Sequence, residues 1–272
     1  MNKFAKYGVI SIAVVIGITT LLPFLWMLSA SFMPQGAANS YPPKIFPERF
    51  DFSHYVSLFT RLNLSKYFSN SLIISVGVTA FSLVFNSMAG YAFAKFRFKK
   101  KKQVFNLLLS SMIIPGQVTM LPVFLILKNL GLINTYWAII VPAAASIFGI
   151  FLIRQYALSI PDSLIEAAKM DGATEFQIYT KVILPLCKPI LVTLGLFTFM
   201  GTWNDFLWPL IVMTDSGMYT MPVALANLMG EHVQDTELMM AGSVVTILPV
   251  LVVFLALQKY YIKGIMMGSV KG

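Results

Sequence analysis

The residues best suited to bind a polar ligand lie inside an apolar stretch, residues 189–213. This stretch contains Trp203, Asn204 and Asp205, and Trp208 follows closely. An ionisable side chain within an apolar segment of membrane length is costly, and it therefore indicates a functional site. Asn204 can donate to and accept from hydroxyl groups, and the two indoles offer flat apolar faces for the C–H side of a pyranose ring. These four residues form a candidate carbohydrate site.

A second interpretation of Asn204 and Asp205 stays open. Polar side chains in membrane helices also hydrogen-bond to neighbouring helices, so these two could hold a partner subunit instead of lining a pathway. Asn86, and Gln117 just after a Pro-Gly pair, are further candidate ligand contacts. Lone polar residues of this kind more often satisfy backbone groups that a nearby proline or glycine leaves free.

A charged segment, residues 161–185, separates two apolar stretches and reads as two short helices back to back. Ser163 and Glu166 have the spacing of a capping box, and so do Thr174 and Gln177. Gly172 lies where a chain leaving a helix needs a left-handed residue. The pattern predicts a helix–turn–helix that projects from a membrane surface.

Enzymatic motifs are absent from the sequence. It has no G-x-x-x-x-G-K-[ST] phosphate loop, so we do not expect it to bind ATP. His54 and His232 are far apart and belong to no H-E-x-x-H motif, so no metal site is expected. Cys187 is the single cysteine, which excludes an internal disulfide and leaves it as a small apolar residue. We expect neither an enzyme nor a cofactor on this chain.

The composition excludes a soluble domain with a wet surface. Hydrophobic residues make up 57% of the 272 residues and charged residues only 11%, and the mean hydropathy is +0.76. Six apolar stretches are long enough for a spanning helix, which needs roughly 20 residues. We therefore predict an all-α membrane protein with one transmembrane domain over residues 1–272 and six helices, at about 7–32, 69–94, 104–127, 136–153, 189–213 and 239–258.

Lys and Arg residues favour the cytoplasmic side of short loops, so their placement predicts the orientation. With both termini in the cytoplasm, 15 of the 20 basic residues fall on inner segments, and the charged segment faces the cytoplasm. The first apolar run is longer than the core of a typical signal peptide, which favours a retained helix. Six basic residues within 95–102 are expected to meet anionic lipid headgroups and not nucleic acid.

Two outer segments follow from this orientation. Residues 33–68 contain four prolines, which disfavour a continuous helix, and one surface helix is expected after Asp51. Residues 214–238 carry several acids and no basic residue. They form an outward surface on which a partner could land.

The charged segment resembles the EAA loop of ABC importer permeases. The resemblance rests on Glu166, Ala167, Ala168, Gly172, Leu184 and Pro185 at the spacing of that family, with Val182 where isoleucine is usual. Residues 89–98, 203–209 and 264–272 are similar to permeases of the carbohydrate-uptake branch, particularly the six-helix maltose-type subunit. The resemblance implies a type I ABC importer permease fold and a multi-pass protein of the cytoplasmic membrane.

The same resemblance implies a mechanism and a set of partners. The charged segment would dock in a cleft of an ATPase through Glu166, Ala167, Ala168, Asp171, Gly172, Leu184 and Pro185. The assembly would contain a second permease as a heterodimer partner, two ATPase subunits that bind ATP and Mg, and an extracytoplasmic solute-binding protein. Alternating access would then move a sugar or oligosaccharide across the lipid bilayer into the cytoplasm.

Three alternatives remain at this point. The charged segment could rest on lipid through Phe176, Ile178, Tyr179 and Val182, although its acidic residues would sit poorly against anionic headgroups. The importer could carry another solute, such as a phosphodiester or a cationic oligomer. The chain could instead be an ion-coupled secondary transporter or channel, in which Asp205 would be a coupling carboxylate.

Overall fold

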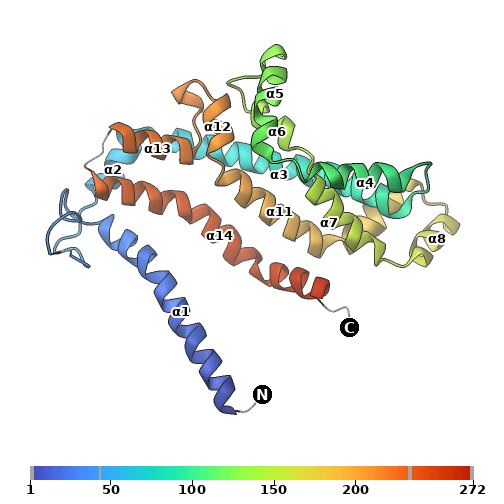
Figure 1. Ribbon diagram of the computed structural model, residues 1–272, viewed down its shortest axis with the longest axis horizontal. Helices are drawn as coiled ribbons and strands as arrows, with labels where there is room; N and C mark the ends of the chain where they lie inside the picture. Colours follow the sequence, from blue (N-terminus) through green and yellow to red (C-terminus); the bar gives the residue numbers. More distant parts are fainter. Residues whose placement is uncertain (1–2, 43, 232–234, 270–272) are drawn as a thin grey trace. The chain divides into compact units, whose positions relative to one another are not determined.

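The computed structural model describes residues 3–42, 44–231 and 235–269 of the chain. Within these ranges all regular secondary structure is helical (Figure 1), which confirms the predicted all-α class. The chain divides into two compact units. One comprises Met1–Lys66 and Val223–Pro249, and the other comprises Tyr67–Pro222 and Val250–Gly272. A single domain over residues 1–272 stays a prediction.

Three helices of the described chain are individually long and apolar enough to cross a membrane. They are α1 (Lys3–Ala30), α3 (Leu64–Lys95) and α14 (Thr236–Ser269). Three further spans would each consist of two helical pieces joined at a bend: α4 (Lys101–Ser111) with α5 (Gly116–Asn129) at 101°, α6 (Trp137–Ala143) with α7 (Ile147–Leu158) at 40°, and Glu175–Leu186 with α11 (Lys188–Trp203) at 78°. By length and composition the described residues therefore contain three to six spans, and the predicted six requires counting each bent pair as one.

The prediction of continuous helices over 104–127, 136–153 and 189–213 is wrong, and prolines account for much of the difference. Pro115 has no N–H and disfavours a helical conformation at the residue before it, so α4 and α5 are separate. The chain leaves α6 just after Pro142, and α7 restarts behind the extended residue Ser146. After Trp203 the chain breaks again, and α12 (Leu207–Val212) places Pro209 in its first turn, where the missing N–H is tolerated.

The outer segments are more ordered than expected. The surface helix predicted after Asp51 is confirmed as α2 (Ser53–Thr60). Asp51 accepts a hydrogen bond from the backbone N–H of Ser53 at 2.8 Å, and this bond lowers the pKa of its carboxyl. The stretch 214–238, predicted as a loop, contains the 3-10 turn η2 (Ser216–Met218) and the helix α13 (Met221–Glu231). His232 lies outside the described residues.

A buried cluster in the second unit joins α3, α7 and α11 to the charged segment. Its members include Tyr91, Ile153, Ile178 and Leu194. Gly90 permits the close packing of α3 against α7, because a Cβ at this position would lie 2.7 Å from Ile153 Cβ. The charged segment is therefore built on a tightly packed base.

Candidate functional site

The charged segment folds as two helices in sequence, as predicted. They are α8 (Asp162–Met170) and α9 (Glu175–Ile178). The capping box of Thr174 and Gln177 is confirmed, since each side chain bonds the backbone N–H of the other, at 3.3 Å and 2.8 Å. The capping box of Ser163 and Glu166 is wrong. Because α8 begins at Asp162, Ser163 lies inside the helix and not at its cap.

Gly172 reverses the chain between the two helices. Its φ of +77° is left-handed, as predicted. The N–H of Gly172 bonds the carbonyl of Lys169 at 3.0 Å, and the N–H of Ala173 bonds that of Ala168 at 3.0 Å. These two bonds form a Schellman motif, which closes the end of α8 without slack.

The C-terminal end of the charged segment forms a π-helical turn, η1 (Tyr179–Ile183), which is followed by α10 (Leu184–Leu186). Pro185 cannot donate a hydrogen bond to the carbonyl four residues earlier, and the N–H of Leu184 bonds Tyr179 O, five residues back. The chain then bends by 78° into α11. The segment thus passes into a spanning helix through short turns and not through a loose linker.

Buried side chains fasten the charged segment to its base. Ile165, Ile178 and Ile183 are each under a tenth exposed and belong to the buried cluster. The Tyr179 hydroxyl lies 2.7 Å from Ser87 Oγ on α3. Since the cluster also contains side chains of α7 and α11, the segment is packed against three helices at once.

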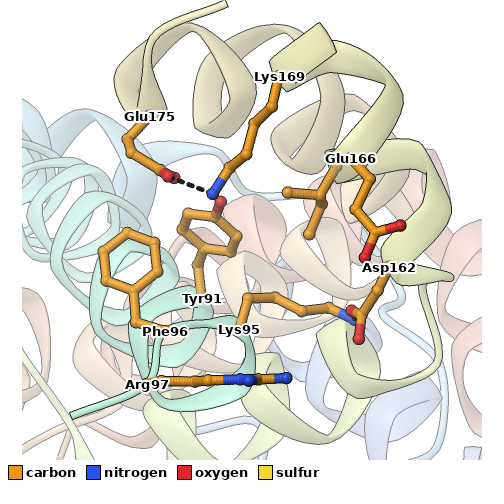
Figure 2. Close-up of a pocket in the computed structure, with 9 residues that line it drawn as sticks. Tyr91, Lys95, Phe96, Arg97, Asp162, Glu166, Lys169 and Glu175 are labelled. Carbon is orange, nitrogen blue, oxygen red and sulfur yellow. Dashed lines mark hydrogen bonds and ion pairs between the residues drawn. The ribbon is translucent and has the colours of Figure 1, made fainter.

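A cleft of about 480 Å³ lies between the end of α3 and the charged segment (Figure 2). Lys95 Nζ lies 2.6 Å from Asp162 Oδ1, and its hydrogen bond and charge lower the pKa of this carboxyl. Lys169 Nζ lies 2.6 Å from Glu175 Oε1, so α8 and α9 are also paired across the turn. Both members of that second pair are half exposed, and such a surface pair adds little stability.

Large apolar side chains of the charged segment are exposed on its surface. Met170 is 88% exposed and Phe176 is 68% exposed. Glu166 and Ala167 are also exposed, and Glu166 lines the cleft toward the end of α3 (Figure 2). Large apolar side chains held out on a rigid support are typical of a surface that binds another protein.

The other residues predicted for this surface divide into two groups. Asp171, Gly172 and Pro185 are exposed. Ala168 and Leu184 are half-buried and pack against the buried cluster. These two therefore support the segment from behind.

A second, smaller cavity of about 240 Å³ lies where the broken helices meet. Asp205 and Trp208 line it, together with residues of α5 and α6. Trp208 is half-buried, and its Nε1 donates to Ala138 O at 3.1 Å. That carbonyl is available because Pro142, four residues later, has no N–H to offer it.

The remaining predicted ligand residues lie elsewhere. Trp203 is 1% exposed and stacks on Phe199 with ring centroids 5.8 Å apart, so it is a core residue. Asn204 is exposed and donates to Met200 O at 2.8 Å. Gln117 is exposed on the first turn of α5.

Asn86 is fully buried and bonds the backbone at the break between α6 and α7. Its side-chain oxygen accepts from the backbone N–H of Ser146 at 2.9 Å, and its Nδ2 donates to Ser82 Oγ at 2.7 Å. The amide therefore satisfies the backbone between α6 and α7, and it has no surface toward a ligand.

Several residues of these sites were not expected from the sequence. Thr119 and Thr202 line the smaller cavity, and Lys95 holds the start of α8. Met170 carries no sequence signal beyond being apolar next to acids. A pairing of Lys95 with Asp162, 67 positions away, could be found only from the fold.

Residues 86–266 match the model of the family described as "Binding-protein-dependent transport system inner membrane component". The chain belongs to this family. It is a multi-pass membrane permease of an ABC importer, a transport subunit and not an enzyme, and the ATPase is a separate subunit. Permeases of this kind work with a solute-binding protein and an ATPase.

The permease is similar over nearly its whole length to proteins of sugar uptake. It is 37% identical to the arabinooligosaccharides transport system permease protein AraQ of Halalkalibacterium halodurans, covering 94% of this chain and 93% of that one. It is 32% identical to the lactose transport system permease protein LacG of Rhizobium radiobacter, covering 100% and 97%. A chain of a bacterial ABC transporter that imports the acidic polysaccharide alginate has a TM-score of 0.84 and 27% identity, covering 96% of this chain and 99% of that one.

Proposed function

We propose that this permease moves a sugar or oligosaccharide into the cytoplasm by alternating access, driven by an ATPase that docks on the charged segment. The observation that carries the proposal is the exposed face of that segment. Met170 and Phe176 are uncovered and Glu166 is exposed, on helices that are packed against α3, α7 and α11. A partner that pulls on this face would pull on three helices without slack.

The chemistry of the face suits a protein better than a lipid surface. Acidic side chains at Glu166 and Asp171 would meet repulsion at anionic headgroups, whereas Glu166 can pair with a basic residue of a protein partner. Exposed Ala167 lets a partner approach the helix backbone closely. Docking into a cleft of the ATPase accounts for the acids and the apolar side chains together.

Relatives support a sugar as the solute. AraQ and LacG are named for the transport of arabinooligosaccharides and lactose, and a third relative, 34% identical, is the melibiose/raffinose/stachyose import permease protein MelC of Bacillus subtilis. The solutes named for these three relatives are neutral glycosides, and the solute of the solved neighbour is an acidic polysaccharide. All of them are carbohydrates, which favours a sugar here over a phosphodiester or a cationic oligomer.

The full assembly completes the proposal. Two ATPase subunits would bind ATP and Mg, a second permease would form the heterodimer, and an extracytoplasmic protein would deliver the solute. Both termini of this chain would lie in the cytoplasm, as would the charged segment. The excess of Lys and Arg on the segments that this orientation places inside supports it.

Reconstitution of the whole importer in vesicles tests the docking surface. Phe176→Ser and Met170→Ser should reduce co-purification of the ATPase and lower ATP-dependent uptake at least about fivefold, because docking rests on few buried contacts. Phe46→Ser is a matched control, since Phe46 is 77% exposed in an outer segment. Equal effects of Phe176→Ser and Phe46→Ser, or none at all, would refute the docking face.

The same vesicles separate an importer from an ion-coupled transporter. Wild-type uptake should require ATP and should survive the collapse of ion gradients. Concentration of solute by this chain in vesicles without any nucleotide would contradict the proposal.

A further inference from the structure

We propose that the 240 Å³ cavity beside Asp205 and Trp208 holds one ring of an uncharged sugar during transport. The inference rests on the proposed function and adds the chemical class of the solute and the residues that select it. The cavity lies within one compact unit, between α5, α6 and the break that joins α11 to α12.

Interrupted helices create the cavity. Gly116 at the start of α5, Ala143 at the end of α6 and Thr202 near the end of α11 all line it. Broken helices expose backbone and small side chains at membrane depth, and they do so where the broken ends surround a cavity. Three such ends around one space are therefore typical of a solute site and not of a lipid-facing surface.

Trp208 supplies a fixed apolar wall. Its ring is held by the hydrogen bond from Nε1 to Ala138 O, so the ring orientation is set before a ligand arrives. The polar edge of the indole is thereby occupied, and the ring surface is what remains for a ligand. A flat ring surface of this kind suits the C–H face of a pyranose.

Asp205 supplies the polar contact and the charge selection. Its Oδ1 lies 3.5 Å from the backbone N of Trp208, and the backbone N–H groups of Phe206 and Leu207 also bond the carboxylate. A carboxylate has about four lone-pair positions on its two oxygens, so it can still accept a hydrogen bond from a hydroxyl group. The described residues that line the cavity include no Lys, Arg or His. A carboxylate with no neighbouring cation favours sugar hydroxyls and disfavours a uronate, whose own carboxylate would be repelled.

Size limits the ligand to a short piece of a glycan. Sites for drug-sized ligands usually have volumes of roughly 300–1,000 Å³, and this cavity is smaller. One ring can therefore occupy the cavity, and an oligosaccharide would extend beyond it.

Thiol labelling provides a direct test, because the only native cysteine of this chain, Cys187, is 1% exposed. Thr119 lines the cavity and its side chain is exposed, so Thr119→Cys should react with a maleimide in the assembled importer. The probe sugar is whichever of arabinotriose, raffinose and maltotriose the wild-type importer takes up. It should slow labelling at least about fivefold, whereas trigalacturonate should not. Ser216→Cys, exposed in the η2 turn, should label at one rate with or without sugar.

Substitutions at Asp205 and Trp208 test whether these two residues set the selectivity for a neutral sugar. Asp205→Asn keeps the side-chain shape and should weaken protection by the probe sugar about tenfold while it removes the discrimination against trigalacturonate. Trp208→Ala should weaken protection by the neutral sugar, and Trp208→Phe should retain most of it. Size-exclusion chromatography should find each variant still assembled with its partners.

Three results would overturn the inference. They are equal protection by the neutral sugar and the uronate, absence of labelling at Thr119→Cys under all conditions, and loss of assembly in Asp205→Asn, which would place Asp205 at a subunit seam. If the wild-type importer shows no ATP-dependent uptake of any of the three sugars, the proposed function fails instead. Uptake without protection of Thr119→Cys would refute only the cavity.

Discussion

Lys95, the last residue of α3, donates from Nζ to Asp162 Oδ1 at 2.6 Å, and also to Ile160 O at 2.5 Å. The Lys95 side chain is 8% exposed and that of Asp162 is 74% exposed. One buried ammonium group thus joins the end of α3 to the start of α8. With the Ser87–Tyr179 hydroxyl pair, it makes a second connection between α3 and the charged segment. We expect movement of the charged segment to move α3 with it.

Replacing Lys95 with methionine should uncouple transport from ATP hydrolysis. The substitution keeps the apolar stem, removes both hydrogen bonds and leaves Ile160 O without this partner, which costs about 1–3 kcal/mol for a buried group. Coupling free energies are typically about 1–3 kcal/mol, so uptake per ATP hydrolysed should fall at least about fivefold. Simultaneous assays of uptake and phosphate release measure the ratio. Lys99→Met, at an exposed position of the same inner loop, should leave it unchanged.

The pair of Lys95 and Asp162 should persist across physiological pH. Because the hydrogen bond to Lys95 lowers the pKa of Asp162 in the folded state below its ordinary value of 3.8, its stabilising contribution is complete above that value. The contribution is lost as the pH falls through the lower folded-state pKa. The melting midpoints of wild type and Asp162→Asn should therefore differ by a constant amount from pH 8 to 5 and converge below about pH 3.8. A difference that already disappears between pH 7 and 5 would contradict this.

The stability cost of substituting Gly172 should depend on backbone conformation alone. A Cβ at this position would meet no atom within 4 Å, but the φ of +77° is unfavourable for most residues. Gly172→Ala should destabilise the segment by about 1–2 kcal/mol, and Gly172→Asn by less, because Asn tolerates the left-handed region. Gly172→Pro cannot adopt this φ and should abolish ATPase docking. Thermal unfolding and co-purification measure the two effects, and equal behaviour of Ala and Asn would refute the argument.

Gly90→Ala should separate α3 from α7. The added Cβ would lie 2.7 Å from Ile153 Cβ and 3.1 Å from Arg154 N, and overpacking of this kind costs about 1–3 kcal/mol. Gly195→Ala is the matched control, because its Cβ would make only an ordinary contact of 3.5 Å with Leu83. The melting midpoint of the purified importer should fall for Gly90→Ala and stay level or rise for Gly195→Ala. A fall for both would point to a general intolerance of alanine.

Local patterns in the sequence predicted the charged segment well. The Thr174–Gln177 capping box and the left-handed Gly172 are short-range features that need no tertiary partner. The capping box predicted at Ser163 is wrong because α8 begins at Asp162, directly after Pro161, so Ser163 lies inside the helix. A capping signal locates a helix start only to within a residue or two, and the contact made at the observed start joins segments that are distant in the sequence. Here Asp162 pairs with Lys95.

The ligand residues were harder to predict because their roles depend on packing between distant segments. Trp203 and Trp208 are equally suitable by residue type, yet one is stacked in the core and the other lines a cavity. For Asn86 the preferred expectation, that it satisfies a free backbone group, is confirmed, but its partner Ser146 lies 60 positions later and could not be named from the sequence. Apolar length indicated where spanning segments lie, but it did not reveal that three of them bend at breaks.

The inner loop after α3 carries six basic residues within 95–102, but they are not equivalent. Lys95 and Lys101 donate to backbone carbonyls, Lys101 to those of Ala94 and Phe96 at 3.1 Å and 2.8 Å. The other four, Arg97, Lys99, Lys100 and Lys102, are exposed. A count of positive residues on this loop therefore overstates the number of side chains that are free to contact phospholipid headgroups directly, which is four of the six. Topology experiments that replace these basic residues one at a time will combine a structural defect with an electrostatic one at Lys95 and Lys101.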